Sequence, residues 1–278
     1  MGVCQCSEAT CCDGQKGDGV KVLALTQSLE GRQTREETLS NGAVYSGQWK
    51  GSSRDGYGKQ TWPDGACYDG TFVDNKAAGY GKFVHADGDI YEGEWKDDKA
   101  HGHGRYQHTD GSTYEGEWIA DKQTGEGVEC WVDGSSYSGQ YKDGLKHGRG
   151  TFVWVDGSKY IGEFSVNDIE GEGTYIWSDG RKYIGQWRGN RMHGRGTFSW
   201  PDGRSYEGEY CEDVKHGRGH FKWPDRREYV GQWRKGKQHG IGKYTDSSGV
   251  SGECEFNMGQ KIRWIQAAEP AAEGERQA

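Results

Sequence analysis

Aromatic and glycine residues recur along this chain with a fixed period of 23 residues. Each period opens with a tyrosine, has a glycine two positions later and has a second aromatic residue two positions after that, as in Tyr160, Gly162 and Phe164. Because alternate residues of a β-strand point to the same face, this spacing predicts a strand with one aromatic face. The tyrosines that open the periods are Tyr45, Tyr68, Tyr91, Tyr114, Tyr137, Tyr160, Tyr183, Tyr206 and Tyr229.

A second alternating segment completes each period. In one period it runs from Gly148 to Trp154, and the pair Asp156 and Gly157 separates it from the next tyrosine. An Asp-Gly pair between two alternating segments is typical of a β-hairpin. We therefore predict an all-β protein, an elongated single-layer twisted antiparallel sheet of tandem 23-residue β-hairpins, with roughly 18–20 strands spaced about 4.8 Å apart.

The repeated glycines indicate how such a sheet is stabilised. The chain has 48 glycines, 16 tyrosines and 12 tryptophans but few leucines, so it lacks the aliphatic residues of an ordinary core. A glycine weakens a strand unless a ring from the neighbouring strand lies on its backbone. We expect aromatic rings to pack on glycines in this way, with Gly148 and Gly150 both on the face of Phe152 and Trp154.

The overall charge and the charged residues limit the classes of partner. A net charge of −8 argues against a role built on phosphate contacts, so no nucleic acid is expected. Acidic residues such as Glu92 lie on first strands and basic residues such as Arg105 on second strands, which predicts a largely self-neutralised face. Direct binding of anionic lipid by the repeats is therefore only a weak expectation.

The repeated motif resembles a known family. The pattern Tyr-x-Gly-x-Trp, His-Gly-x-Gly and Asp-Gly, as in Tyr91 to Trp95 followed by His101 to Gly104, is similar to the MORN (membrane occupation and recognition nexus) repeat. The resemblance covers about residues 41 to 260. It implies a scaffold that joins membranes, cytoskeleton or partner proteins.

The repeat pattern predicts five segments along the chain. The capping repeat near the C-terminal end is interpreted as two residues short, with Val250, Gly252 and Cys254 at the Tyr, Gly and Trp positions. The segments are an acylated, flexible N-terminal anchor at 1–19, an N-terminal cap and half repeat at 20–40, nine MORN repeats at 41–248, a degenerate capping repeat at 249–266 and a disordered tail at 267–278.

The first residues contain the clearest candidate site. Met1 to Ser7 resembles an N-myristoylation signal, although Cys6 stands where the motif has Ser or Thr. One myristoyl chain gives only marginal membrane binding, and no Lys or Arg precedes Lys16, so cysteine acylation is the expected second anchor. The alternative is unmodified cysteines in a frayed tail. The predicted lipidation sites are Gly2 for myristate and Cys4, Cys6, Cys11 and Cys12 for palmitate.

No active site, cofactor site or metal site is predicted. Nearly every polar residue recurs with the repeat, whereas catalysis needs a unique constellation of side chains. His101 and His103 are one residue apart on a predicted strand and so should point to opposite faces, which disfavours a shared metal ion. We therefore expect a protein that is not an enzyme.

Four β-branched residues interrupt the charged face of successive strands. Val153, Ile161, Ile176 and Ile184 fall where most other periods have Ser, Thr, Glu, Lys or Arg. Two interpretations stay open. These residues either favour strand geometry and cross-strand contact, or they form a partner-binding or self-association surface.

Three functional hypotheses follow from these patterns. The first is a membrane-tethered scaffold or adaptor that links a membrane or membrane skeleton to cytosolic or cytoskeletal proteins, at the cytosolic face of the plasma membrane or of a cortical or pellicular membrane. The sequence shows no run of about 20 apolar residues and no secretory signal, consistent with a chain facing the cytosol. The second is a soluble ciliary or cytoskeletal component. The third is a non-catalytic regulatory subunit of a lipid kinase or another separate enzyme, since we expect no catalytic domain after Trp264.

Overall fold

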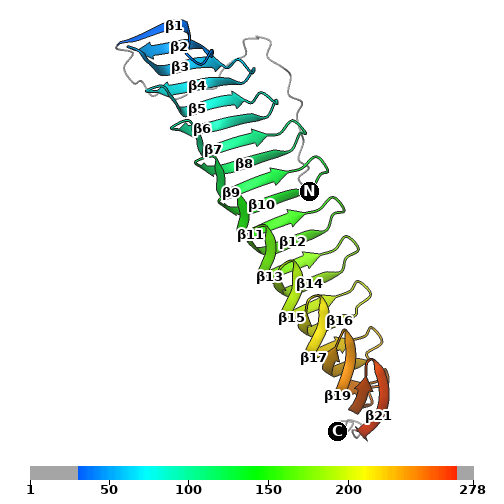
Figure 1. Cartoon of the computed structure of the whole chain (residues 1–278). Helices are drawn as coiled ribbons and strands as arrows, with labels where there is room; N and C mark the ends of the chain where they lie inside the picture. Colours follow the sequence, from blue (N-terminus) through cyan, green and yellow to red (C-terminus); the bar gives the residue numbers. More distant parts are fainter. Residues whose placement is uncertain (1–30, 268–278) are drawn as a thin grey trace, which may run out of the picture. The chain divides into compact units, whose positions relative to one another are not determined.

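The computed structural model describes residues 31–267, and these residues form 21 β-strands and no α-helix (Figure 1). Consecutive strands pair antiparallel within each of two compact units, residues 31–121 and 122–267 of the described chain. Below they are called the first unit and the second unit. The predicted fold class, a single-layer antiparallel sheet of tandem β-hairpins, is confirmed.

The strand lengths alternate between seven and nine residues through the repeats. In the first unit the strands are β1 (Arg32–Thr38), β2 (Val44–Lys50), β3 (Ser53–Thr61), β4 (Cys67–Val73), β5 (Lys76–Val84), β6 (Ile90–Lys96), β7 (Lys99–Gln107) and β8 (Thr113–Ile119). In the second unit they are β9 (Lys122–Cys130), β10 (Ser136–Lys142), β11 (Leu145–Val153), β12 (Lys159–Ser165), β13 (Asp168–Ile176), β14 (Lys182–Arg188), β15 (Arg191–Ser199), β16 (Ser205–Cys211), β17 (Val214–Lys222), β18 (Glu228–Arg234), β19 (Lys237–Thr245), β20 (Ser251–Asn257) and β21 (Gln260–Ala267).

The Asp-Gly turns join the strands as predicted. Between β11 and β12 the amide of Trp154 donates to the carbonyl of Ser158 at 2.9 Å, and Asp156 Oδ1 accepts from the amide of Ser158 at 2.8 Å. Gly157 has a φ of 81°, which is a left-handed conformation that glycine adopts without steric cost. The side-chain cap and the glycine together fix the turn.

Tyrosine rings lie on paired glycines, as the sequence predicts. Tyr137 of β10 is fully buried, and its ring covers both Gly139 on its own strand and Gly150 directly opposite on β11. A Cβ at Gly139 would lie 2.7 Å from the Tyr137 hydroxyl oxygen, and one at Gly150 would lie 2.5 Å from it. The hydroxyl donates to the carbonyl of Gln140 at 3.0 Å. Any side chain at either glycine would therefore displace the ring.

The first glycine of each His-Gly-x-Gly segment differs from the prediction. Gly148 has a φ of 62°, and a side chain there would meet the side chain of Gln140 instead of an aromatic ring. Gln140 Oε1 accepts from the amide of Arg149 at 3.0 Å, beside a shift in strand register between Gly139 and Tyr141. The prediction that Gly148 lies on the aromatic face was wrong. The positive φ of Gly148 turns its Cβ direction towards the opposite face.

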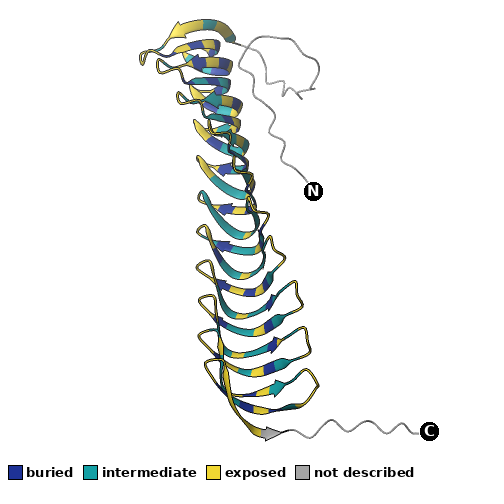
Figure 2. Cartoon of the chain, turned by 90° about the vertical axis from the view of Figure 1, so that its right-hand side faces the viewer, coloured by how far each residue is buried: buried dark blue, intermediate teal, exposed yellow. Residues whose placement is uncertain are grey.

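Rings from neighbouring repeats also pack on one another within each unit. Phe164 lies between Tyr137 and Tyr160, with ring centroids 5.1 Å and 5.2 Å away and both interplanar angles at 89°. Edge-to-face pairs of this kind contribute about 0.5–1.5 kcal/mol beyond the area that they bury. Figure 2 shows the resulting buried positions recurring along the strands. These contacts connect each hairpin to the next one.

A second connection between hairpins lies at the turn that follows the seven-residue strand. Asp213 has a φ of 67°; its amide donates to the carbonyl of Met192 at 2.9 Å, and its Oδ1 accepts from the amide of Met192 at 2.8 Å. Each such residue thus satisfies both backbone groups of a residue 21 positions earlier. The same side-chain bond is made by Asn75, Asp98, Asp121, Asn167 and Asn190.

The C-terminal repeat keeps the full period, which corrects the sequence interpretation. In the pairing of β19 with β20, Gly252 lies opposite Tyr244 and Phe256 lies opposite Gly240. Gly252 therefore occupies the tyrosine position, and Phe256 occupies the second aromatic position with its ring 4.9 Å from Tyr229. Cys254 takes the glycine position and is fully buried. Without a tyrosine ring to cover it, that position has room for a side chain.

Some predicted features lie outside the described residues. These are the anchor at 1–19, with its lipidation residues, the part of the N-terminal cap at 20–30, and the predicted tail from residue 268 onwards. Residue 267, the first of the predicted tail, is the last residue of β21. At the start of the described chain, β1 pairs with β2, and the amide of Leu39 donates to the carbonyl of Ala43 at 2.8 Å, as in the other Asp-Gly type turns. This is the geometry that a half repeat requires.

Candidate functional site

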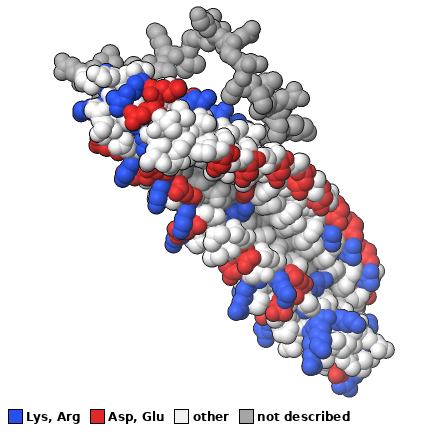
Figure 3. All heavy atoms as spheres, turned by 45° about the horizontal axis from the view of Figure 1, so that its top comes forward, with Lys and Arg blue, Asp and Glu red and all other residues white. Residues whose placement is uncertain are grey.

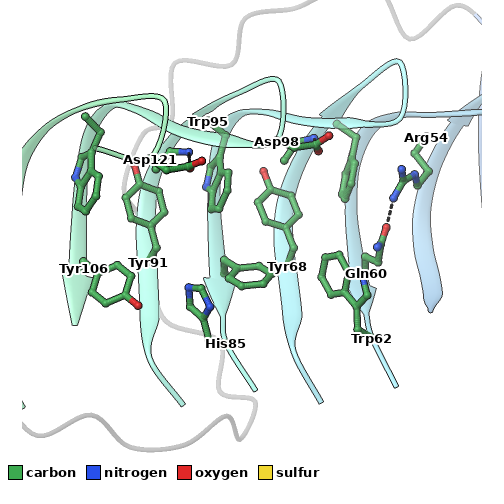
Figure 4. Close-up of a pocket in the computed structure, with 15 residues that line it drawn as sticks. Arg54, Gln60, Trp62, Tyr68, His85, Tyr91, Trp95, Asp98, Tyr106 and Asp121 are labelled. Atoms are coloured by element: carbon green, nitrogen blue, oxygen red, sulfur yellow. Dashed lines mark hydrogen bonds between the residues drawn. The ribbon is translucent and has the colours of Figure 1, made fainter. Parts of the chain in front are cut away.

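A groove of about 500 Å³ opens on the aromatic face of the first unit (Figure 4). It extends over two consecutive repeats and consists of two similar chambers, here called ring boxes. Each ring box is lined by four rings around one alanine. Ala77 of β5 is the alanine of the first ring box, and Ala100 of β7 is that of the second.

The first ring box is built from three strands and the turn between β3 and β4. Its rings are 5.2 Å apart for Tyr68 and Trp95, 6.1 Å apart for Phe83 and Trp95, and 5.6 Å apart for Trp62 and Phe83. Tyr68 is held in place by its hydroxyl, which donates to the carbonyl of Thr71 at 3.1 Å. Trp95 is held by its indole NH, which donates to the carbonyl of Gly81 at 2.9 Å.

The second ring box repeats this arrangement one period later. Its rings are 5.3 Å apart for Tyr91 and Trp118, 6.3 Å apart for Tyr106 and Trp118, and 5.9 Å apart for His85 and Tyr106. A histidine thus takes the place that Trp62 has in the first ring box. The Tyr106 hydroxyl donates to Asp89 Oδ2 at 2.8 Å, which fixes its ring at the margin of the groove.

Each ring box has one carboxylate at its rim. Asp98 Oδ1 accepts from the amide of Ala77 at 2.7 Å, and Asp121 Oδ1 accepts from the amide of Ala100 at 2.8 Å. Figure 4 shows Asp98 beside the hydroxyl end of Tyr68 and Asp121 beside that of Tyr91. Burial, and after it the negative charge of Asp98, raises the pKa of the Tyr68 hydroxyl. The carboxylate therefore acts electrostatically on the interior of the ring box.

Arg54 lies at one end of the groove. Its guanidinium stands 5.1 Å from the ring centroid of Phe72 and 5.9 Å from that of Tyr45. It donates to the side chain of Gln60, which is almost fully buried, and to the backbone carbonyl of Asn75. These partners hold the arginine over its own rings and leave the two ring boxes beyond it open.

The repeats match a known family over most of the chain. The family model of the MORN repeat matches nine consecutive segments, of which the first is residues 45–67 and the last is residues 229–251. The chain belongs to the MORN repeat family. The predicted family is thereby confirmed, and the coarse function that it carries is that of a repeat scaffold. MORN repeats are in general non-catalytic modules.

Comparisons with individual proteins add little to this assignment. Comparison with curated proteins finds no significant match. Among solved structures, the TCP10 domain of Danio rerio CPAP in complex with a STIL peptide has a TM-score of 0.45 and 11% identity, covering 86% of this chain and 100% of that one. The TCP domain of Drosophila melanogaster SAS-4 with a proline-rich motif of Ana2 has a TM-score of 0.35 and 14% identity, covering 67% and 96%. The family assignment rests on the MORN repeats alone.

The four β-branched residues singled out in the MORN sequence lie on one face, opposite the rings, but in two rows. Ile161 lies opposite Thr174, which in turn lies opposite Ile184, and the two isoleucines are 44% and 48% exposed. Val153 and Ile176 are both half-buried, and both lie opposite Lys159. In each row the two aliphatic residues are therefore separated by a threonine or a lysine. Whether this surface binds a partner stays a prediction.

Charged residues of opposite sign face one another across the strands of the first unit. Lys82 of β5 lies opposite Asp69 on one side and Glu92 on the other, and Arg105 of β7 lies between Glu92 and Glu115. Figure 3 shows such acidic and basic side chains mixed at the margins of the repeats, with uncharged atoms between them. Between residues 31 and 267 no cluster of three or more His, Cys, Asp or Glu is placed to hold a metal ion, and no helix could cross a membrane.

The groove was not found from the sequence. The residues that open it, Ala77 and Ala100, occupy a position that varies from one MORN repeat to the next, so a search for recurring residues passes over it. The available signal was the size of the variable residue. Two successive alanines in a ring-rich repeat leave space that larger side chains would fill.

Proposed function

We propose that this MORN protein is a scaffold that holds protein partners at the cytosolic face of a membrane. The observation that carries the proposal is the open groove of the first unit, where eight rings surround Ala77 and Ala100 beneath two carboxylates. An apolar concave site with a few fixed polar groups is the usual form of a ligand-binding site. A rigid repeat array keeps such a site in shape without a ligand. The proposal assigns the chain no catalytic role.

The membrane attachment is supported by the sequence of residues 1–7. Gly2 follows Met1, and Cys4 and Cys6 lie close enough to be acylated at the same membrane surface. Two acyl chains give stable anchoring where one myristoyl chain does not. We therefore assign myristate to Gly2 and thioester-linked chains to Cys4 or Cys6.

The attachment is tested on the full chain in the cells that produce it. Intact mass should show both modifications, and hydroxylamine, which cleaves thioesters, should release the protein from the membrane fraction. The chain carrying Gly2→Ala, Cys4→Ala and Cys6→Ala should be recovered in the soluble fraction, whereas Ser7→Ala serves as the matched control and should stay bound. Membrane residence of the triple variant would refute anchoring through Gly2, Cys4 and Cys6. Membrane residence that persists when Cys11→Ala and Cys12→Ala are added would refute the acyl anchor and favour the alternative of a ciliary or cytoskeletal component held by its partners.

The scaffold role is tested by filling the groove. Ala77→Leu with Ala100→Leu places aliphatic side chains in both ring boxes, and Ile169 shows that a large aliphatic residue is accommodated at the same repeat position. Tyr80→Leu, on the exposed outer side of β5, is the control for a changed surface. Proteins that co-purify with the unmodified chain and with the control but not with the filled chain are groove-dependent partners. Identical co-purification with all three forms contradicts the proposal.

A further inference from the structure

The groove exists because two successive repeats carry alanine at the tenth position of the period. The side chain at this position lies on the aromatic face, among the four rings of its ring box. Ala77 and Ala100 are themselves buried, and their small side chains line the groove. The residues at the tenth position of the other repeats are Arg54, Gln123, Lys146, Ile169, Met192, Lys215, Gln238 and Lys261.

The second unit shows what a filled ring box contains. Lys215 inserts its side chain among four rings, with Nζ 4.5 Å from the ring centroid of Phe221, 5.1 Å from those of Trp200 and Trp233, and 5.2 Å from that of Tyr206. An ammonium group this close to several ring faces is attracted by their quadrupoles. The lysine of the protein itself thus acts as the occupant of this ring box.

Lys146 fills another ring box of the second unit and has a carboxylate beside it. Its Nζ lies 4.7 Å from the ring centroid of Trp131 and 5.2 Å from that of Tyr137. The same atom forms an ion pair with Glu129 at 2.8 Å, and both side chains are largely shielded from solvent. In this ring box the lysine ammonium group is therefore held by both aromatic rings and a carboxylate of the same chain.

The two open ring boxes of the first unit have the same ring positions. Trp62, Tyr68, Phe83 and Trp95 stand six repeats before the four rings around Lys215, and their counterparts around Ala100 stand five repeats before them. Each open ring box also has a carboxylate, Asp98 or Asp121, at the rim. The Lys215 box has Gly236 at the corresponding position.

This carboxylate changes how well a ring box accepts a cation. Burial, and after it the charge of Arg204, lowers the pKa of Lys215 to about 8, so its ring box penalises the ammonium form. An acidic group at the rim offsets that penalty, because an opposite charge nearby favours the charged form of a buried amine. The open ring boxes thus have the rings, the space and the negative charge that a lysine side chain requires.

We infer that the groove of the first unit binds a partner segment that inserts two lysine side chains, one above Ala77 and one above Ala100. This inference rests on the proposed scaffold function and names the chemistry of its partner. The two ring boxes are two strands apart, a separation of roughly 9–10 Å at the backbone. Lysines three residues apart in a polyproline II segment lie on one edge about 9.3 Å apart. The partner motif is therefore Lys-x-x-Lys in an extended segment.

The test measures binding of a defined peptide to the full chain. The probe is the peptide Pro-Lys-Pro-Pro-Lys-Pro-amide with a fluorophore on its N-terminal nitrogen, so that both lysine amines stay free, and fluorescence polarisation reports its binding. A peptide with norleucine in place of both lysines keeps the aliphatic part and removes the charge. We expect the norleucine peptide to bind at least about tenfold more weakly than the lysine peptide.

The variants of the chain use residues that other repeats already carry. Asp98→Asn with Asp121→Asn keeps the bond to the backbone amide, as Asn75, Asn167 and Asn190 do, and should weaken binding of the lysine peptide by roughly tenfold. Ala77→Lys with Ala100→Lys fills both ring boxes as Lys146 and Lys215 do, and should abolish binding. Tyr57→Lys with Tyr80→Lys adds the same two charges at exposed positions of β3 and β5 and should leave binding unchanged.

Each outcome decides a separate point. Equal binding of the norleucine peptide, or undiminished binding by the Ala77→Lys and Ala100→Lys chain, overturns the inference. Peptide binding that emerges only after Lys16→Ala and Lys21→Ala would identify an N-terminal segment of the same chain as the occupant, which also overturns it. Failure of the acyl anchor together with specific peptide binding would refute only the membrane attachment. Circular dichroism of every variant verifies that the sheet is intact.

Discussion

The hydroxyl oxygen of Tyr137 occupies the space that a side chain on Gly150 would need, since a Cβ at Gly150 would lie within 2.5 Å of it. The tyrosine is on β10 and the glycine is directly across the pair on β11, where Gly150 also lies opposite Gly139. The close approach of the ring and the absence of the side chain are therefore a single requirement. Removing either one leaves the other without its packing partner.

We expect Gly150→Val to destabilise the second unit far more than His147→Ala. Valine displaces the Tyr137 ring and breaks its bond to Gln140, and overpacking of this kind costs about 1–3 kcal/mol. His147 is only half-buried, and its loss should stay within roughly 0.5 kcal/mol. Urea denaturation followed by tryptophan fluorescence measures both. Similar losses for the two variants would contradict the packing of rings on glycines.

The hairpins could be predicted because their signals are local and repeated. The segment from Tyr160 to Phe164 falls within β12, and the turn at Asp156 and Gly157 has the geometry that its residues favour. The reversal of Gly148 could not be read from simple alternation, because the positive φ of this residue breaks the alternation itself. The recurring Gln or Glu at the fourth position of the period, such as Gln140, was the available indication that a second side chain needed room there.

The bonds between hairpins were hidden for a different reason. Asp213 contacts Met192, a residue 21 positions away with no distinctive chemistry of its own. Asp, Asn and Gly all occur at positions equivalent to Asp213 in the other repeats. This variation indicates only a turn with a left-handed residue and does not reveal the contact with Met192. The open ring boxes could not be predicted for a similar reason. They arise because Ala77 and Ala100 have small side chains where other repeats have large ones.

A series at Asp213 tests the bonds between hairpins. Asp213→Asn keeps an oxygen acceptor for the Met192 amide and should be nearly neutral. Asp213→Gly loses the side-chain bond but keeps the left-handed backbone, whereas Asp213→Ala loses the bond and strains a backbone with a φ of 67°. We expect a loss of about 1 kcal/mol for Gly and about 2 kcal/mol for Ala, measured by thermal unfolding. An alanine variant as stable as the asparagine variant would show that this contact contributes nothing.

Lys215→Met should stabilise the protein at neutral pH. Lys215 has a folded-state pKa of about 8 against an ordinary value of 10.5, so the unfolded chain holds this proton more tightly. The free energy of unfolding therefore increases as the pH rises from about 8 to about 10.5. Below pH 8 the folded protein bears the full cost of burying the charged ammonium group. Methionine already occupies the same repeat position at Met192. A gain of about 1 kcal/mol would raise the Tm by roughly 2–4 °C.

The pH dependence provides the check on this substitution. The difference in Tm between the Lys215→Met chain and the unmodified chain should shrink as the pH is raised from about 7 to about 10. The tyrosines with raised pKa titrate above this range in both chains and cancel in the comparison. A difference that stays constant across the range would show that Lys215 is not desolvated.

The β-branched face is tested with Ile161→Thr and Ile184→Thr together. Threonine keeps the β-branch, and the partners opposite these isoleucines are already threonines, so the fold should remain intact by circular dichroism. If the face mediates self-association, sedimentation should show loss of the dimer. Unchanged sedimentation would leave strand propensity as the reason for the two isoleucines.

The contacts between hairpins have a consequence for how the copy number of the repeats can change. The indole NH of Trp233 reaches back 14 residues to Gly219, and Asp213 reaches back 21 residues to Met192, so both contacts end within the preceding period. An in-frame gene duplication or excision of one whole period leaves every such group facing an equivalent partner. Loss of a single codon within a strand moves the following side chains of that strand to the other face. The fold of this array is therefore expected to tolerate the gain or loss of whole hairpins, but not the loss of a single residue within a strand.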